Sequence, residues 1–167
     1  MKEVKIPENR VGALIGEGGK TKEEFEDLTE CELVVEDNVA RIDGEPLAEM
    51  NAQNVVKAIG RGFNPEKAFR LLERDVALYI IDISEYASSS NSRDRLKGRV
   101  IGRDGEAKRH VEKMTEIDMC IYGKTIGLIG KAQNIEVAQE AITMLLNGSS
   151  HSTAYSYLEK NQGKIVK

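Results

Sequence analysis

The apolar positions near the start of the chain follow a strand spacing and then a helix spacing. Alternation over residues 4–7 predicts a strand that Pro7 ends. Residues 11–15 form a short apolar run that predicts a helix. Phe25 and Leu28, three positions apart, predict the buried face of a second helix.

The following segment predicts a strand pair and a long helix. Residues 33–36 and 39–42 alternate as strands. Pro46 is typical of a first helical position, and a helix from there would end at residues 60–62, which contain two glycines. The apolar side of this helix is expected to hold Leu47, Met50, Val55, Val56 and Ile59.

The second half of the chain has the same order of elements. We expect an opening strand at residues 77–83, a helix whose buried face holds Val111 and Met114, and strands at 117–122 and 125–129. A closing helix would bury Ile135, Ala138, Ala141, Ile142 and Leu145. Each half is therefore predicted as strand, helix, helix, strand, strand, helix.

A connector joins the two halves. Asn64 and Pro65 are typical of a helix cap and a first helical turn. They predict a helix that runs through Arg74, packs by Phe69 and Leu72, and couples the halves rigidly.

Two further segments have weaker patterns. Residues 88–92 are polar and are expected to be weakly structured, as is most of the tail after Asn147. A short helix in the tail would carry Tyr155, Tyr157 and Leu158, with Ser152 or Thr153 as its cap.

The halves also match in residue identity. At an offset of 86 residues, identical residues coincide without a gap, as in Gly12 and Gly98, Ile15 and Ile101, Gly16 and Gly102, Gly19 and Gly105, Lys22 and Lys108, and Thr29 and Thr115. Two copies of so long a period indicate a duplicated domain. We expect domains at 1–62 and 76–148, a connector at 63–75 and a tail at 149–167.

Composition fits a protein of this kind. The 167 residues suffice for two small domains, and 40% hydrophobic with 31% charged residues is ordinary for globular proteins. No apolar run reaches the roughly 20 residues of a membrane helix. Because the first ten residues are charged and lack an apolar signal core, we expect a cytoplasmic protein with no membrane partner.

Charge is distributed unevenly along the chain. Residues 1–83 carry 11 basic and 18 acidic residues, whereas residues 84–167 carry 13 basic and 10 acidic ones. Eight basic residues fall within 93–113, and eleven acidic ones within 23–49. Such asymmetry predicts two surfaces for two kinds of partner, although charge runs are also typical of plain solvated surface.

The halves agree best at a glycine-rich joint between two helices, residues 16–19 and 102–105. Glycine permits positive φ and lets another backbone come close. The joint leads into a helix N-terminus, which attracts phosphate. Glycines that merely end a helix are the alternative, but two occurrences at one place favour phosphate contact.

Other chemistries have little support in the sequence. Gly19-Lys20-Thr21 resembles the end of a nucleotide-binding loop, but Leu14 stands where that loop needs its first glycine. Two cysteines and two histidines match no metal site, disulfide framework or nucleophile with a base, so we expect no metal, no cofactor and no catalytic residue. Cys31 and Cys120 are expected to pack as small apolar groups.

Residues 12–19 and 98–105 resemble the signature of type I KH domains. The resemblance implies an α+β fold of β-α-α-β-β-α order, in which a three-stranded antiparallel sheet packs against three helices. It also implies that the glycine loop clamps about four unpaired nucleotides. The two copies depart from the pattern alike, since Lys22 and Lys108 stand where isoleucine is usual. This suggests that both lysines point toward the phosphates.

The tandem order, the connector and the tail from residue 148 resemble, more narrowly, the archaeal ribosomal RNA-processing KH proteins related to Partner of NOB. Nearly the whole chain is covered. The resemblance implies binding to the 3′-terminal region of small-subunit ribosomal RNA. It also implies association with a NOB-type endonuclease and with the alpha subunit of translation initiation factor two.

The charges around the loops predict a division of labour. The second copy is expected to be the main RNA clamp, because basic residues surround its loop. Its candidate RNA-binding residues are Lys97, Gly98, Arg99, Val100, Ile101, Gly102, Arg103, Asp104, Gly105, Lys108 and Arg109. The resemblance implies that Val100 and Ile101 are either groove-side or core apolar residues, with Leu14 and Ile15 as their counterparts. The secondary candidates in the more acidic first copy are Gly12, Leu14, Ile15, Gly16, Glu17, Gly18, Gly19, Lys20 and Lys22.

The sequence allows three functions. Non-catalytic binding of single-stranded RNA during ribosome maturation is favoured. A scaffold that recruits a processing nuclease or an initiation factor through its acidic first domain is the alternative, and an enzyme acting on RNA comes last.

Overall fold

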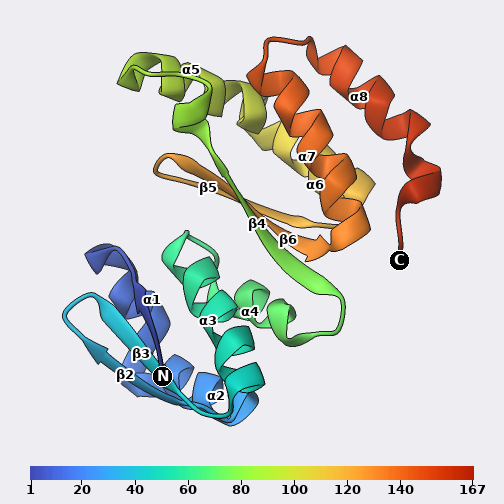
Figure 1. Cartoon of the computed structure of the whole chain (residues 1–167). Helices are drawn as coiled ribbons and strands as arrows, with labels where there is room; N and C mark the ends of the chain where they lie inside the picture. The colour runs from blue at the N-terminus through green and yellow to red at the C-terminus, as the bar shows by residue number, and fades with distance from the viewer. The chain divides into compact units, whose positions relative to one another are not determined.

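The computed structural model describes all residues, 1–167, and they form two compact units, residues 1–78 and 79–167. Figure 1 shows the elements of each unit. Unit 1 contains β1 (Lys2–Lys5), α1 (Val11–Ile15), α2 (Lys20–Thr29), β2 (Glu32–Glu36), β3 (Val39–Asp43) and α3 (Pro46–Gly60). Its sheet has the order β1-β3-β2, with both pairs antiparallel.

The core of unit 1 lies between this sheet and its helices. Phe25, Leu33 and Ile59 are fully buried, as alternation and helix spacing predict. The prediction for Leu28 and for the first turns of α3 is wrong. Leu28 is 52% exposed and Leu47 67%, because these positions turn away from the sheet; Met50 is likewise 52% exposed.

The connector is shorter and less regular than predicted. It consists of α4 (Pro65–Ala68) and a 3-10 turn (Phe69–Leu72), so no helix continues through Arg74. The cap is confirmed, since the amide of Lys67 donates to Asn64 Oδ1 at 2.8 Å. Both pieces pack on α3 and therefore extend unit 1.

Unit 2 repeats the architecture. It is built from β4 (Val76–Asp82), whose first three residues fall in unit 1, α5 (Ser90–Ile101), α6 (Glu106–Thr115), β5 (Asp118–Tyr122), β6 (Thr125–Lys131) and α7 (Ala132–Leu146). The sheet order is β4-β6-β5, and Figure 1 shows α5, α6 and α7 over one face. The predicted α+β fold, with two three-stranded antiparallel sheets, is confirmed.

Helix α5 is longer than the sequence suggests. Ser89 caps it by accepting the amide of Ser92 at 3.1 Å, so residues 90–92 are its first turn rather than the weakly structured stretch that was expected. The segment is polar because this turn is exposed.

The tail is ordered as α8 (His151–Lys160), which packs on α7 and α6. Its cap is Ser150, whose hydroxyl accepts the amide of Thr153 at 3.1 Å, and not Ser152 or Thr153. The buried Asn134 then pairs with both the amide and the carbonyl of Val166, at 2.8 Å each, and fixes the end of the chain to α7.

Several repeated identities have a common structural role. Thr29 and Thr115 are buried, and each hydroxyl donates to the carbonyl four residues earlier, at 2.7 and 2.6 Å. Glu26 and Glu112 each accept the amide at the start of the following strand, from Leu33 at 2.9 Å and from Met119 at 3.0 Å. The duplication therefore preserves how the second helix joins the sheet.

Candidate nucleic-acid interface

The two glycine joints have nearly the same backbone. Gly16 has φ 78° and ψ 170°, and Gly102 has φ 75° and ψ 175°. An added Cβ on Gly102 would lie 2.7 Å from the amide nitrogen of Ala107, and one on Gly16 would lie 2.7 Å from that of Thr21. Only glycine fits these positions, for both conformational and steric reasons.

The third and fourth positions of each loop are left-handed. Gly18 and Asp104 occupy the third position at φ 62° and 53°, and Gly19 and Gly105 follow at 81° and 79°. No side chain caps α2 or α6. The amides of Gly19 and Gly105 donate to the carbonyls of Gly16 and Gly102 at 3.2 Å, and no side chain takes up the amides that follow them. Each loop therefore presents backbone amides and a positive helix end to an anion.

A second pair of glycines keeps the surface beside each loop open. Gly12 and Gly98 lie on exposed helical turns, and a Cβ on either would meet nothing within 4 Å. Nothing inside the protein requires glycine there, and glycine within a helix costs about 0.5–1 kcal/mol relative to alanine. A side chain at either position would project into the open space beside the loop.

The loops differ in charge. Arg103 is exposed in the second loop, where Glu17 is exposed in the first. Arg109 Nη1 donates to the carbonyl of Asp104 at 2.7 Å and braces the second loop. Glu23 is the corresponding residue of the first copy, which therefore lacks this brace.

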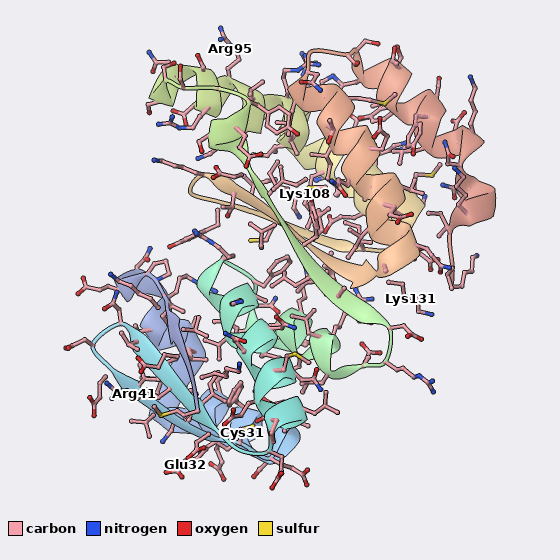
Figure 2. All side chains as sticks on the ribbon, in the orientation of Figure 1. Cys31, Glu32, Arg41, Arg95, Lys108 and Lys131 are labelled. Carbon is pink, nitrogen blue, oxygen red and sulfur yellow. The ribbon has the colours of Figure 1, made fainter.

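Four other lysines lie near the loops, two in each copy. Lys108 Nζ lies 3.2 Å from Glu112 Oε1 on the same helix, and Lys97 lies 3.9 Å from Asp94. Figure 2 shows Lys108 in unit 2. In the first copy Lys20 is exposed and Lys22 is half-buried. The pairs of Lys108 with Glu112 and of Lys97 with Asp94 neutralise the basic cluster only in part, because solvent-accessible ion pairs are weak.

Three candidates turn out to be structural. Val100 and Leu14 have no exposed surface, so their side chains belong to the core and cannot touch RNA. Ile101 and Ile15, one position later, are half-buried and stay available. Arg99 Nε donates to the carbonyl of Leu145 at 3.0 Å, and its Nη2 donates to that of Ser149, so its guanidinium braces the end of α7.

Two residues beside the second loop are not predicted by the sequence as part of a site. His151 and Tyr155 of α8 line a pocket together with Gly102 and Arg103. Their spacing of four residues in a helical tail was the available signal, but it did not indicate which surface the helix covers.

The remaining cysteine and histidine side chains differ in burial and in contacts. Cys31 is buried, as predicted, and burial raises the pKa of its thiol. Cys120 is half-buried, and His110 packs on Tyr155. No three His, Cys, Asp or Glu side chains are grouped to hold a metal ion, and none of the helices has the length and apolarity that crossing a membrane requires.

The sheet order and the paired glycine loops define two type I KH domains in tandem. A family model described as eukaryotic type KH-domain (KH-domain type I) matches residues 5–76 and 77–163. A KH domain-containing protein of Methanocaldococcus jannaschii is 43% identical over 97% of this chain and 74% of its own length. The chain belongs to the PNO1/Dim2-like KH proteins.

Further relatives and solved structures agree with this assignment. A pre-rRNA-processing protein of Aspergillus oryzae is 34% identical over 68% of this chain, which spans 45% of that protein's length. The crystal structure of Dim2p from Pyrococcus horikoshii has a TM-score of 0.90 at 38% identity, covering 95% of this chain and 98% of its own. A chain of the a/eIF2alpha-aDim2p-rRNA complex from the same organism has a TM-score of 0.91 at 37% identity, covering 98% and 94%.

Proposed function

We propose that this chain is a non-catalytic protein that binds single-stranded ribosomal RNA, with the second glycine loop as its main clamp. The observation that carries the proposal is that both loops share one backbone while only the second carries Arg103 in place of an acidic residue. Both loops therefore offer a polyanion the same backbone geometry, whereas only the second loop adds an arginine side chain.

The proposed contact surface follows from the exposed parts of the second copy. The phosphates lie along the loop and the start of α6, with the open face at Gly98 admitting the sugar-phosphate backbone. Arg103 and Lys108 supply cations, and Ile101 lies at the half-buried edge where a base can rest. Arg99 and Val100 act by shaping α5.

We place the target in the 3′-terminal region of small-subunit ribosomal RNA. The support is the family assignment, the pre-rRNA-processing relatives, and the solved Dim2p complex that contains rRNA. The first domain adds a weaker contact, because its loop has Glu17 where the second has Arg103. In a tandem pair even a weak contact raises affinity when both domains reach one strand.

A reciprocal loop exchange tests this proposal. Arg103→Glu with Asp104→Gly gives the second loop the sequence of the first, and Glu17→Arg with Gly18→Asp does the reverse. The matching φ values show that each loop tolerates the other's residues. We expect the first exchange to weaken binding to a small-subunit 3′-terminal RNA oligomer at least 10-fold and the second to leave it equal or tighter. Equal losses from both would contradict the asymmetric clamp.

A second candidate function concerns the first domain. Leu47 and Met50 are exposed on α3, and Leu28 on α2, within a segment that carries eleven acidic residues. We propose that this surface binds a basic protein partner, either a NOB-type endonuclease or the alpha subunit of initiation factor two. The complex of the Pyrococcus horikoshii protein with a/eIF2alpha supports the latter. Association that survives the loop exchange but not Leu47→Ser with Met50→Ser would support this function.

A further inference from the structure

Helix α8 closes one side of a pocket beside the second glycine loop. The pocket has a volume of about 290 Å³, and its lining residues come from the loop, α6 and α8: Gly102, Arg103, Glu106, Ala107, His151 and Tyr155. It is continuous with the proposed clamp, because it shares Gly102 and Arg103 with the loop. Small-ligand sites start at roughly 300 Å³, so this space suits one small ring system rather than a longer segment.

The aromatic wall of the pocket is held in place. The ring of Tyr155 lies 4.1 Å from that of His110, at an interplanar angle of 43°. The ring of His151 lies edge-on to Tyr155 at 6.2 Å. Unpaired bases stack on aromatic side chains of this kind. A rigid aromatic wall next to a phosphate clamp is therefore suited to hold a base.

The other α8 residue in the pocket is anchored to α5. His151 Nε2 lies 2.8 Å from the carbonyl oxygen of Arg99. Since a carbonyl only accepts, Nε2 carries the hydrogen, and the Nδ1 of the neutral ring is then an acceptor. The guanidinium of the same Arg99 holds the carbonyls of Leu145 and Ser149. The start of α8 is thus tied to the helix that leads into the loop.

The charges of the lining indicate which part of a nucleotide enters. Glu106 contributes a carboxylate, which repels phosphate and accepts hydrogen bonds from base amino groups. Arg103, shared with the loop, can pair with the phosphate outside. Uracil has no amino group, whereas cytosine and adenine do.

We infer that this pocket binds one unpaired nucleobase bearing an amino group, next to the nucleotides clamped by the second loop. The inference rests on the proposed RNA-binding function and extends it, since α8 lies outside the β-α-α-β-β-α unit. The tail helix then serves as a second wall of the RNA site.

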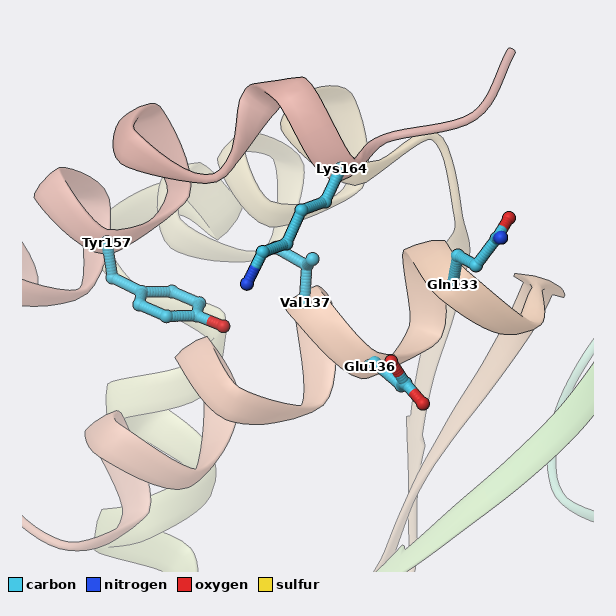
Figure 3. A pocket seen from close by; sticks show the side chains of 5 residues that line it. All are labelled: Gln133, Glu136, Val137, Tyr157 and Lys164. Atoms are coloured by element: carbon cyan, nitrogen blue, oxygen red, sulfur yellow. The ribbon is translucent and has the colours of Figure 1, made fainter.

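A matched pair of variants on α8 tests this. Tyr155 and Tyr157 are both half-buried, but Tyr157 lines a different pocket of about 350 Å³ with Gln133, Glu136, Val137 and Lys164. Figure 3 shows Tyr157 and Lys164 beside the α7 residues of that pocket, which shares no residue with the loop. Tyr155→Leu and Tyr157→Leu therefore remove similar rings, only one of them beside the clamp.

Binding is measured by fluorescence anisotropy with the full chain. The probes are a four-nucleotide RNA selected for tightest binding and the same RNA with one cytidine or one uridine added at either end. We expect cytidine at one end to tighten wild-type binding about 10-fold and uridine to do less. Tyr155→Leu should lose this gain while keeping affinity for the four-nucleotide RNA, and Tyr157→Leu should keep both.

The outcomes separate the two proposals. If the four-nucleotide RNA binds but cytidine adds no affinity, or adds as much to Tyr155→Leu, the pocket inference is overturned and the clamp stands. If wild type binds no single-stranded RNA, the proposed function itself fails. Should Tyr155→Leu not fold, the exposed Glu106→Ala serves instead. It removes the acceptor, which Glu106→Gln would keep in its amide oxygen, and it should abolish the preference for cytidine over uridine. A preference that persists in Glu106→Ala would also overturn the inference.

Discussion

Arg99 Nε donates to the carbonyl oxygen of Leu145 at 3.0 Å, across 46 positions of the chain. Unit 1 contains the same brace, since Arg10 donates to Ile59 at 2.8 Å and to Phe63 at 2.8 Å. The accepting carbonyls correspond exactly under the 86-residue offset, but the arginines stand three positions apart in register. The two arginines therefore differ in position by about one helical turn, and each holds the end of the closing helix in its own unit.

The brace predicts that Arg99 matters for stability. Arg99→Met removes two charge-assisted hydrogen bonds and should lower the free energy of unfolding by about 1–3 kcal/mol, measured by urea denaturation. Arg95→Met, on the same helix, is the control, because Arg95 is exposed and projects from α5 in Figure 2. It should change stability by less than about 0.5 kcal/mol. A stable Arg99→Met variant that loses only RNA affinity would show that Arg99 contacts RNA.

Gly98→Ala should have opposite effects on folding and binding. Alanine is the better helix former, so the free energy of unfolding should rise by about 0.5–1 kcal/mol. The methyl group would occupy the open face, so RNA affinity should fall several-fold in a titration. Gly12→Ala is the matched control, and we expect the same stabilisation with a smaller loss of affinity. Unchanged affinity in Gly98→Ala would place the RNA backbone elsewhere.

Gly102 lies four residues after Gly98, but Gly102→Ala should destabilise the protein. Its Cβ would lie 2.7 Å from the amide nitrogen of Ala107, and φ 75° with ψ 175° is a conformation that only glycine readily adopts. Strain of this kind costs about 1–3 kcal/mol. A drop in melting temperature for Gly102→Ala beside a rise for Gly98→Ala would separate the two glycine roles, whereas a rise in both would refute the predicted loop geometry.

Salt dependence should count the phosphate contacts. The logarithm of affinity falls with the logarithm of salt concentration by about 0.7 per contact for single strands. Arg103→Gln should reduce that slope by about 0.7, measured between roughly 50 and 300 mM salt. Glu17→Gln should leave the slope unchanged. A slope in Arg103→Gln equal to that of wild type would mean that Arg103 pairs with no phosphate.

Acid should destabilise unit 1 through Glu49. Its carboxylate accepts the amide of Gly44 at 3.0 Å and pairs with the terminal amine of Met1 at 3.0 Å, and these contacts lower its pKa from the usual 4.5. Because the folded-state pKa is the lower one, the stabilisation is complete above pH 4.5 and is lost as pH falls through the folded value. Glu49→Gln should be less stable than wild type at pH 7, and the difference should shrink in urea unfolding as the pH falls below 4.5. Glu45→Gln, an exposed neighbour, is the control, and a difference that grows in acid would contradict the prediction.

Much of this molecule was predictable from local pattern. The order of elements, the antiparallel sheets and both glycine loops follow from residues close together in sequence. Local pattern did not predict which apolar residues of the first helices are buried. Leu14, Val100 and Ile101 are all apolar and helical, yet the first two are fully buried and Ile101 is half-buried. Which side of a short helix faces the sheet depends on how the helix docks.

The sequence by itself determined the duplication, the special backbone of the loops and the excess of positive charge around the second one, since glycine conformation, residue identity and charge belong to the chain. Only the tertiary structure decided that Arg99 braces α7 and that Tyr155 of the tail lies beside Gly102. These relationships join residues 46 and 53 positions apart, and no spacing rule reaches that far. They exist because the buried faces of α5, α6, α7 and α8 pack together and leave those polar and aromatic groups in contact.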